Sequence, residues 1–356
     1  MNKLIILQTV APDYRKKFFQ CIKGSLNNNF TLYAGKEYFE NSVKTDESIT
    51  FLKNVKNHYF FYRKFLFQTG MWQDCLKSNT LVMEMNPRII SNWILLITRL
   101  ILRRKNVLWG HAWPRNGRNS NSDKLRNIMR LLADEIIVYT KTQAKELKEK
   151  MPNKTINAAP NAVFYKSEMV ISDVPYEDIN NIIYVGRLTE AKKALFLVDA
   201  FIKIIDDLPN KVRLIIVGEG EEKSKIINLV ARKKLENRVQ VMGHIGDYDT
   251  LQNLYSKSLL SISPGYVGLS ITQSFGFGVP MLISKNEKHS PEIEAVIKGE
   301  NACFFETDDI ESFKNKLLSF FEQKKYWINK RTSISEYCKE NYSTEKMAES
   351  FINLAH

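Results

Sequence analysis

The sequence is poor in cysteine. It holds 4 cysteines in 356 residues, which lie far apart with no CxxC pair and no run of cysteine and histidine. This spacing excludes a disulfide-stapled scaffold and argues against a structural zinc site, and it is typical of free thiols in a reducing compartment. The cysteines are Cys21, Cys75, Cys303 and Cys338.

Long apolar runs are also missing. The longest, residues 93–102, is interrupted by Arg99, and it is much shorter than the ~20 residues that a membrane-spanning helix needs. The apolar start, residues 1–7, has no small-residue cleavage site after it, so we expect a buried first strand and not a signal peptide. These absences predict a cytoplasmic protein.

Low-complexity tracts and short repeats are absent as well. Apolar residues make up 44% of the chain and charged residues 26%, which excludes a disordered or fibrous protein. At roughly 100–200 residues per domain, the length predicts two domains, each large enough for its own core.

The positive charge is concentrated in the first half. The chain has 52 Lys and Arg against 39 Asp and Glu, a net charge of +13. Residues 1–170 hold 28 of these cations against 13 acids, and the remainder holds 24 against 26. This asymmetry suggests that one domain meets an anionic partner, and solvated basic helix faces are the alternative. The densest run contains Arg99, Arg103, Arg104, Lys105, Arg115, Arg118, Lys124, Arg126 and Arg130.

The second half alternates short apolar runs with amphipathic stretches. Because parallel strands need crossover helices, this alternation predicts an α/β fold with a parallel, doubly wound sheet. The expected strands are residues 182–185, 213–217, 239–242, 259–263 and 280–283, and the expected helices are residues 194–205, 221–234, 250–257 and 270–277.

The first half repeats this theme less regularly. We therefore expect two Rossmann-like domains that face each other across a cleft, with the ligand outside the carboxyl ends of the strands. The domains are residues 1–165 and 166–340, and a last helix, 341–356, packs back on the first. In the first half the expected strands are residues 3–7, 30–33, 81–83, 107–109 and 135–139, and the expected helices are residues 14–22, 91–102, 125–132 and 143–150.

Glycines follow four strands of the second half, where a glycine lets the chain turn and a ligand approach closely. In the first turn, Arg187 offers a planar fork for phosphate oxygens, and Lys192 adds a second charge. The fourth turn enters a helix whose N-terminus suits a diphosphate, and Gln273 inside it is placed to bond a hydroxyl group. The turns hold Gly186, Arg187 and Lys192, then Gly218, then Gly243 and His244, then Gly268, Leu269 and Ser270.

In order and spacing, these segments resemble the family 4 retaining glycosyltransferases of the GT-B fold, notably members that assemble bacterial surface polysaccharides. The resemblance covers nearly the whole second half. It implies that Arg187 and Lys192 bind the pyrophosphate of a nucleotide-diphosphate sugar, that residues 241–244 bind the base, and that residues 268–273 form the donor-binding helix. The donor is then a substrate, and no cofactor is implied.

The first half resembles this family more loosely. Residues 107–111 are similar to a strand that ends in a cleft histidine, His111, and residues 159–163 to the end of the acceptor domain, with Ala162 where glycine is usual. Pro12, Tyr14 and Arg15 lie in a segment that resembles a first loop of some polysaccharide-assembly members. The resemblance thus implies an acceptor-binding first domain for a saccharide or lipid-linked acceptor.

One departure from the family pattern concerns its two glutamates, eight positions apart around the donor helix. Here Gly265 and Gln273 occupy these positions. Gln273 can still hydrogen-bond a ribose hydroxyl without charge assistance, and backbone groups of residues 268–270 can replace the contact that Gly265 cannot make. A nucleotide-sugar-binding homologue without turnover therefore stays an alternative.

The implied mechanism is same-face attack with retention, in which a donor phosphate oxygen helps to deprotonate the acceptor. Arg187, Lys192 and the helix N-terminus would stabilise the charge that develops on the leaving diphosphate, so no metal is required. His111 would project toward the sugar; the alternative is a buried histidine bonded to backbone. In residues 247–249, an Asp-Tyr-Asp sequence has the form of a metal site but is better explained as a helix cap.

Three features of the basic first half are each open to more than one interpretation. A nucleic-acid-binding protein would explain the charge, although no nucleic-acid module is recognisable, so we expect no nucleic acid. The aromatic and basic residues 58–67 fit either a lipid-linked acceptor or membrane face, or packing beneath the acceptor cleft. A helix within residues 88–104 fits an anionic lipid surface, and covering a sheet is the favoured alternative. A peripheral position at the inner face of the cell membrane is thus compatible with the sequence.

Overall fold

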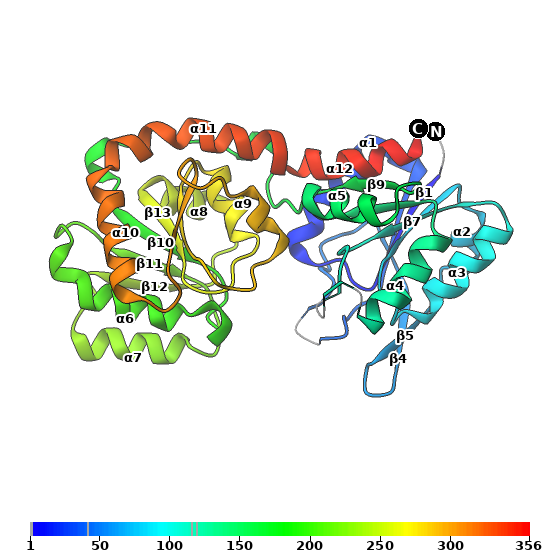
Figure 1. The fold of residues 1–356 in the computed structure, drawn as a ribbon, viewed down its shortest axis with the longest axis horizontal. Helices are drawn as coiled ribbons and strands as arrows, with labels where there is room; N and C mark the ends of the chain where they lie inside the picture. The colour runs from blue at the N-terminus through cyan, green and yellow to red at the C-terminus, as the bar shows by residue number, and fades with distance from the viewer. Residues whose placement is uncertain (1–2, 41–42, 115–116, 119) are drawn as a thin grey trace. The chain divides into compact units, whose positions relative to one another are not determined.

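The computed structural model describes residues 3–40, 43–114, 117–118 and 120–356. The first two residues of the expected strand 1–7 and Arg115 of the basic run lie outside this part of the chain. Two compact units are present: unit 1 comprises Met1–Val163 and Ser343–His356, and unit 2 comprises Phe164–Tyr342. The chain therefore enters unit 2 and returns to unit 1 for its last helix (Figure 1).

Unit 1 is built on a parallel sheet of seven strands in the order β3-β2-β1-β6-β7-β8-β9. An antiparallel hairpin, β4–β5, stands apart from this sheet. The strands are β1 (Leu4–Gln8), β2 (Phe30–Ala34), β3 (Leu52–Asn54), β4 (Lys56–Phe60), β5 (Phe65–Thr69), β6 (Thr80–Glu84), β7 (Lys105–Trp109), β8 (Glu135–Val138) and β9 (Thr155–Ala158). The helices are α1 (Lys16–Leu26), α2 (Trp72–Lys77), α3 (Ile90–Ile101), α4 (Asn121–Leu132), α5 (Lys141–Lys150) and α12 (Thr344–Ile352).

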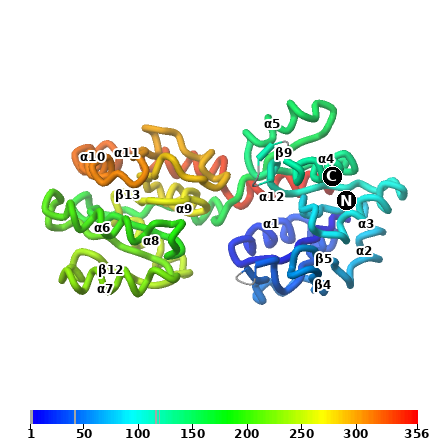
Figure 2. Tube along the Cα trace, turned by 60° about the horizontal axis from the view of Figure 1, so that its bottom comes forward, coloured from blue at the N-terminus to red at the C-terminus, as the bar shows by residue number. Residues whose placement is uncertain are grey.

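Both faces of this sheet are covered, which explains why β1 is apolar throughout. Successive side chains of a strand point to opposite faces. Leu4 and Ile6 accordingly pack in the cluster that contains residues of α1 and α12, whereas Ile5 and Leu7 pack in the cluster formed with α2, α3 and α4. Helix α12 lies beside α1 in both views (Figure 1, Figure 2).

Unit 2 is built on a parallel sheet of six strands in the order β12-β11-β10-β13-β14-β15. The strands are β10 (Asn181–Val185), β11 (Leu214–Val217), β12 (Val239–Gly243), β13 (Ser258–Ser263), β14 (Met281–Ser284) and β15 (Ala302–Phe305). The helices are α6 (Ala194–Ile204), α7 (Lys223–Lys233), α8 (Tyr248–Ser256), α9 (Ser270–Gly276), α10 (Ile310–Glu322) and α11 (Lys324–Tyr342).

Each sheet thus has its first strand in the middle and reverses its strand order there, between β1 and β6 in unit 1 and between β10 and β13 in unit 2. This is the Rossmann order, whose ligands bind at the carboxyl ends of the strands beside the reversal. The prediction of doubly wound parallel sheets is confirmed. Among the described residues, no helix is long and apolar enough to cross a bilayer.

Candidate functional site

In unit 2, the turns after β10, β11 and β12 are hydrogen-bonded to one another. The amide of Gly186 donates to Val217 O at 3.0 Å, and the amide of Gly218 donates to Gly243 O at 2.8 Å. A side chain at position 218 would not fit, because its Cβ would lie 1.9 Å from Gly186 O. The predicted glycines therefore hold the Arg187 turn in place through backbone contacts.

Arg187 and Lys192 carry the positive charge of this edge. Arg187 is exposed, whereas Lys192 is half-buried and donates from Nζ to Tyr266 O at 2.8 Å. The ammonium also lies 4.4 Å from the centroid of the Tyr266 ring. Burial and, secondarily, the neighbouring Arg187 lower the pKa of Lys192 to about 8, although buried Glu292 acts in the opposite direction. Because the charges of Arg187 and Lys192 repel each other, the pair favours binding of an anionic ligand.

Gly265 is required by a close backbone approach. A Cβ at this position would lie 2.5 Å from Ala191 O and 2.9 Å from Lys192 C. The next residue, Tyr266, donates its amide to Ala191 O at 2.9 Å and so brings its carbonyl to the Lys192 ammonium. The absent family glutamate is therefore replaced by a loop that lies directly on the Lys192 turn.

The loop before α9 is held by a second segment, residues 284–292. Val267 donates its amide to Nδ1 of His289 at 3.3 Å, and Ser290 returns its amide to Val267 O at 2.9 Å. Because Nδ1 accepts, His289 is neutral in this arrangement, and burial lowers its pKa. His289 was not among the predicted site residues, because it carries no motif and lies outside the glycine turns.

The donor-helix residues begin where this loop ends. Ile271 donates its amide to Gly268 O at 3.0 Å, and Gln273 donates its amide to Leu269 O at 3.0 Å. The amides of Leu269 and Ser270 precede these bonds at the helix start, where amides lack an intrahelical acceptor. Gln273 is half-buried, one turn into α9 as predicted.

His244 and the Asp-Tyr-Asp sequence of residues 247–249 follow β12. His244 is exposed, and its amide supports the Glu219 carboxylate, which also pairs with Lys223 at 2.5 Å. Asp247 is the N-cap of α8 and accepts from the amide of Thr250 at 2.8 Å. The predicted helix cap is confirmed.

In unit 1, Arg15 is at the centre of the predicted acceptor-side group. Its guanidinium donates to the hydroxyl of Tyr139 at 2.9 Å and to Oε1 of Gln8 at 3.2 Å, and it lies 4.4 Å from the Trp109 ring centroid. Burial acts to lower the pKa of Arg15, but Tyr139, Tyr14 and Glu84 together raise it above its ordinary value. Of the other predicted residues, Pro12 is buried and accepts from the Arg15 amide, and Tyr14 is exposed.

Glu84, at the end of β6, is a site residue that the sequence analysis missed. Its carboxylate accepts the amide of Thr9, so it joins the ends of β1 and β6 at the strand reversal. Burial raises the pKa of this carboxyl, and Arg15 acts in the opposite direction. The sequence signal that could have identified Glu84 is its position as the last residue of a buried strand, because the predicted site cations also follow the ends of strands.

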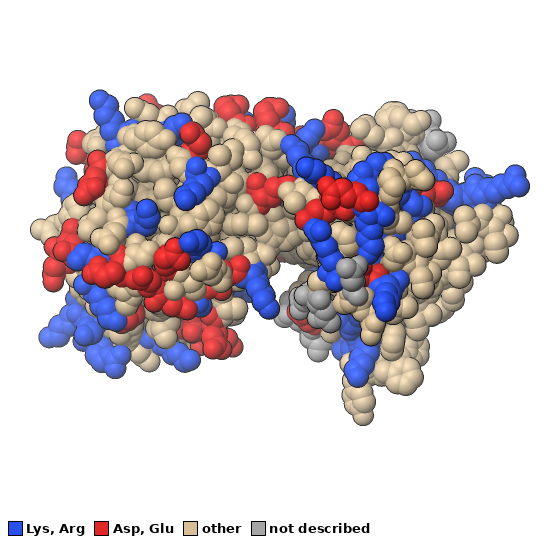
Figure 3. Space-filling model, viewed as in Figure 1, with Lys and Arg blue, Asp and Glu red and all other residues tan. Residues whose placement is uncertain are grey.

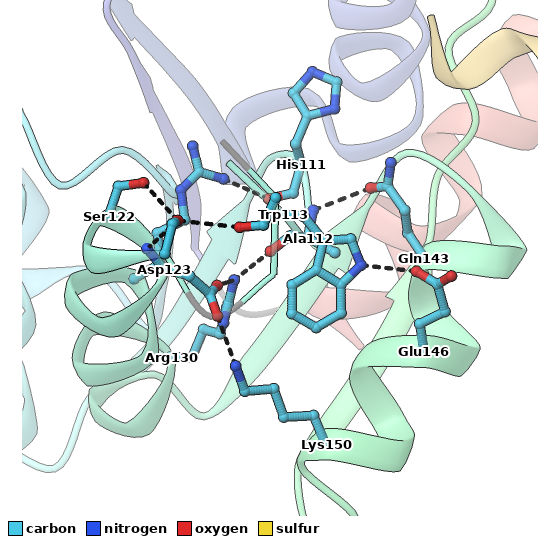
Figure 4. Close-up of polar contacts among 12 residues, drawn as sticks. His111, Ala112, Trp113, Ser122, Asp123, Arg130, Gln143, Glu146 and Lys150 are labelled. Atoms are coloured by element: carbon cyan, nitrogen blue, oxygen red, sulfur yellow. Dashed lines mark hydrogen bonds and ion pairs between the residues drawn. The ribbon is translucent and has the colours of Figure 1, made fainter. Parts of the chain in front are cut away.

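His111, which follows β7, is exposed and not the buried histidine of the alternative interpretation. Its ring contacts the ring of Tyr139 edge-on, with 4.7 Å between centroids. The backbone around it is fixed: Arg126 donates to His111 O at 2.7 Å, and the amide of Ala112 donates to Gln143 Oε1 at 3.0 Å. In Figure 4 the His111 ring points away from these contacts.

A buried ion pair supports the turn that carries His111. Asp123 and Arg130 are 1% and 0% exposed and lie 2.9 Å apart, and Lys150 reaches the second carboxylate oxygen at 2.6 Å. Arg130 also donates to the carbonyl of Ala112 (Figure 4). The structure thus brings Arg15 and His111 together around Tyr139 in unit 1, and Arg187, Lys192 and the α9 loop together in unit 2.

The solved structures compared below are GT-B glycosyltransferases, and their fold covers both Rossmann-like domains of this chain. The fold prediction is confirmed. Residues 168–341, nearly all of unit 2, match the family described as glycosyl transferases group 1. This match and the relatives below support a GT-B glycosyltransferase.

Two curated relatives carry specific names. N-acetyl-alpha-D-glucosaminyl L-malate synthase of Bacillus anthracis is 23% identical over 238 residues, which cover 64% of this chain and 61% of that protein. Poly(glycerol-phosphate) alpha-glucosyltransferase of Bacillus subtilis strain 168 is 24% identical over 193 residues, which cover 53% of this chain and 28% of that protein. The matched region therefore spans less than two thirds of either relative.

Solved structures share the whole fold at low identity. HepE of Anabaena in complex with UDP has a TM-score of 0.72 and 15% identity, with 99% of both chains covered. TarM has a TM-score of 0.68 and 12% identity, with 100% of this chain and 99% of that chain covered. At these identities, the likeness establishes the fold alone.

Proposed function

We propose that this protein is a retaining glycosyltransferase that moves a hexosyl group from a nucleotide-diphosphate sugar to a saccharide or lipid-linked acceptor in surface-polysaccharide biosynthesis. The observation that carries the proposal is the pair Arg187 and Lys192 at the strand reversal of unit 2, where half-buried Lys192 donates to Tyr266 O, has its pKa lowered to about 8 and would be stabilised by a bound anion. The pair supplies the positive charge for the diphosphate, so we propose a metal-independent reaction.

The proposed donor is a UDP-sugar. HepE and the pneumococcal transferase GtfA were both solved with UDP, the latter together with GlcNAc. In this chain the base would lie on the Gly243–His244 turn and the diphosphate between Arg187, Lys192 and the amides of Leu269 and Ser270. As the sugar–phosphate bond breaks, these groups stabilise the charge that grows on the leaving diphosphate.

Retention is supported by the names of two relatives, which specify alpha-linked sugars. From an alpha-linked nucleotide sugar, such a product keeps its anomeric configuration. We propose that the acceptor binds to unit 1, with His111 facing the sugar and with Pro12, Tyr14 and Arg15 on the acceptor side. Arg15, held by Tyr139 and Gln8, presents a fixed charge there.

The test is transfer from UDP-glucose and UDP-N-acetylglucosamine, after a thermal-shift screen with nucleotide sugars, since a ligand of the folded state raises its stability. Arg187→Ala and Lys192→Ala should each lower kcat/KM by about 100-fold or more, as loss of a donor to a developing anion does. Lys203→Ala is the matched control, because Lys203 pairs with Asp199 on the surface of the same unit. Near-normal transfer by both site variants would overturn the donor site.

A non-catalytic nucleotide-sugar-binding homologue is the second candidate, and the observation behind it is Gly265, whose surroundings leave no room for a glutamate. Saturable UDP-sugar binding without transfer or hydrolysis, over a broad acceptor panel, would select this second candidate.

A further inference from the structure

Helix α3 buries its charged side chain and exposes apolar side chains. Its one charged side chain, Arg99, is 0% exposed and donates to backbone carbonyls, among them Lys105 O at 2.8 Å and Ser78 O at 3.1 Å, and to the side chain of Asn106 at 2.9 Å. Burial lowers the pKa of Arg99 to about 10. The outward side chains of α3, by contrast, are isoleucines and a leucine.

These outward side chains form a continuous strip. Ile90, Ile94, Ile97 and Ile101 are spaced at i, i+4, i+7 and i+11, which places them on one helix face. Ile97 is 47% exposed and Ile101 is 75% exposed, whereas Leu95 and Leu96 cover the sheet. The favoured expectation, a helix that covers a sheet, is therefore confirmed, and the outward isoleucines give α3 a second apolar face.

The strip continues onto the neighbouring elements. Helix α4 packs beside α3 and exposes Leu125, Ile128 and Leu131. On the other side, β5 contacts α3, and Leu66 bridges to Ile89. We call the combined surface the apolar face; it comprises Phe60, Phe61, Tyr62, Phe65, Ile90, Ile94, Ile97, Leu100, Ile101, Leu102, Leu125, Ile128 and Leu131.

The tip of the β4–β5 hairpin holds aromatic side chains out from the protein. Phe61, Tyr62 and Arg63 have φ values of 50°, 54° and 62°, a left-handed conformation that bulky residues rarely adopt. Arg88 fixes this tip by donating to the carbonyls of Lys64 and Arg63, each at 2.7 Å. Tyr62 is 101% exposed. The hairpin tip is therefore not packed beneath a cleft, and its backbone is strained. Strain of this kind marks functional sites.

The two segments that carry the hairpin and α3 have charge of one sign, and Glu37, from outside them, pairs with Arg63 of the tip at 3.4 Å. The sequence has no Asp or Glu in residues 48–73, which span the hairpin, or in residues 85–122, which span α3. These two segments contain 4 and 7 Lys and Arg, respectively. The single acid of α4, Asp123, is buried in its ion pair. In Figure 3 the surface over α3 and the hairpin tip is largely tan, with blue side chains beside it.

We infer that the apolar face docks on an anionic lipid bilayer. Aliphatic and aromatic side chains would enter the boundary between headgroups and acyl chains, while Lys64, Arg88, Arg103, Arg104 and Lys124 meet lipid phosphates. A nucleic acid would leave the apolar side chains in water, and a second protein of mixed charge would leave the cations without partners. The inference extends the proposed action on a lipid-linked acceptor. Only the biological purpose of membrane binding, and not the binding itself, rests on that proposed function.

The experiment is flotation of the full chain with vesicles of phosphatidylcholine, with and without phosphatidylglycerol. Binding should require phosphatidylglycerol and weaken with salt. Ile97→Gln should lower the vesicle partition coefficient by about tenfold, because it removes one large side chain from the lipid. Ile227→Gln is the matched control, since Ile227 is 44% exposed on α7 of unit 2. Phe61→Asn with Tyr62→Asn should cause a larger loss, and asparagine tolerates positive φ.

Several outcomes would overturn the inference. These are no binding to anionic vesicles, an equal loss in Ile227→Gln, or a concentration-dependent dimer without lipid that Ile97→Gln dissociates. UDP binding by thermal shift is measured on the same variants and should be unchanged. If the unsubstituted protein binds UDP but not anionic vesicles, only the docking face is overturned, whereas vesicle binding by an unsubstituted protein that binds no nucleotide sugar overturns only the proposed function.

Discussion

Unit 1 and unit 2 share one strand order but differ in charge and surface. Unit 1 holds 28 Lys and Arg against 14 Asp and Glu, and unit 2 holds 24 against 25. In unit 2 the two cations proposed to bind the donor, Arg187 and Lys192, follow β10 at the strand reversal, whereas unit 1 spreads its cations over the carboxyl ends of its strands and around the apolar face. The scaffold therefore does not decide what each unit binds; the turns and outer helices do.

The difference also shows how far net charge can mislead. The basic run 99–130 begins and ends with arginines that are 0% exposed, Arg99 and Arg130. Both donate to backbone carbonyls and so act as structural donors. Two acids of unit 1, Asp123 and Glu135, are buried as well, so the outward surplus is not reduced. Its position follows from the absence of carboxylates along residues 85–122 and not from the two buried arginines of the basic run.

The largest effect should come from Asp123→Ala, which tests whether the two units are separate in stability. The substitution leaves Arg130 buried without its carboxylate, and breaking a buried pair costs about 3–5 kcal/mol. We expect hydrogen exchange to accelerate in peptides of unit 1, residues 105–150 above all, while peptides of unit 2 keep their protection. An equal loss in both units would mean that they unfold as one.

The second prediction compares one substitution in both units. Gly265→Ala forces a methyl group against Ala191 O and should cost about 1–3 kcal/mol of donor binding and stability, as overpacking does. Gly24→Ala, in α1, meets no atom within 4 Å and should stabilise unit 1 by about 0.5–1 kcal/mol. Denaturant unfolding and UDP titration measure both variants. A Gly265→Ala protein with unchanged UDP affinity would show that this approach does not shape the donor site.

The smallest effect is a pH dependence confined to unit 2. Lys192 has its pKa lowered to about 8 in the free protein, and a bound diphosphate would raise it, so binding takes up a proton above that pH. UDP affinity should therefore fall as pH rises, by about tenfold between pH 7 and pH 9. Calorimetry in buffers of different ionisation enthalpy should detect the proton uptake, and Lys192→Arg should abolish it. The same pH dependence in Lys192→Arg would assign it to another group.

Sequence patterns predicted most of the fold because buried parallel strands are short apolar runs between amphipathic helices. They missed β3, the hairpin, β9 and β15, whose strands are partly exposed, and helices α2, α10 and α11. The last helix, expected at 341–356, is interrupted by the Ser343 cap, so α11 ends at Tyr342 and α12 begins at Thr344. Weak apolar periodicity explains why α11 was not predicted. Helix α10 has a clear pattern, with Phe313, Leu317 and Phe320 on one buried face, and was overlooked.

The candidate site was predictable where a motif coincided with a strand end, as for Arg187, Lys192 and Arg15. Glu84, Tyr139 and His289 were not predicted, because a carboxyl, a phenol or an imidazole has no signature in sequence until the fold shows what it faces. The reason for Gly265 was equally hidden from sequence. The pattern showed only a missing glutamate, and the position of the Ala191 carbonyl shows why no side chain fits.

The return of the chain to unit 1 has a consequence for biosynthesis. Phe351 of α12 packs its ring 4.9 Å from Phe18 and 4.8 Å from Trp109, centroid to centroid, and Ser350 bonds Ala158 O. Phe18 and Trp109 thus lack part of their core packing until α12 has been synthesised. Unit 2 holds all its own strands in one continuous stretch, and it can fold while unit 1 is still waiting.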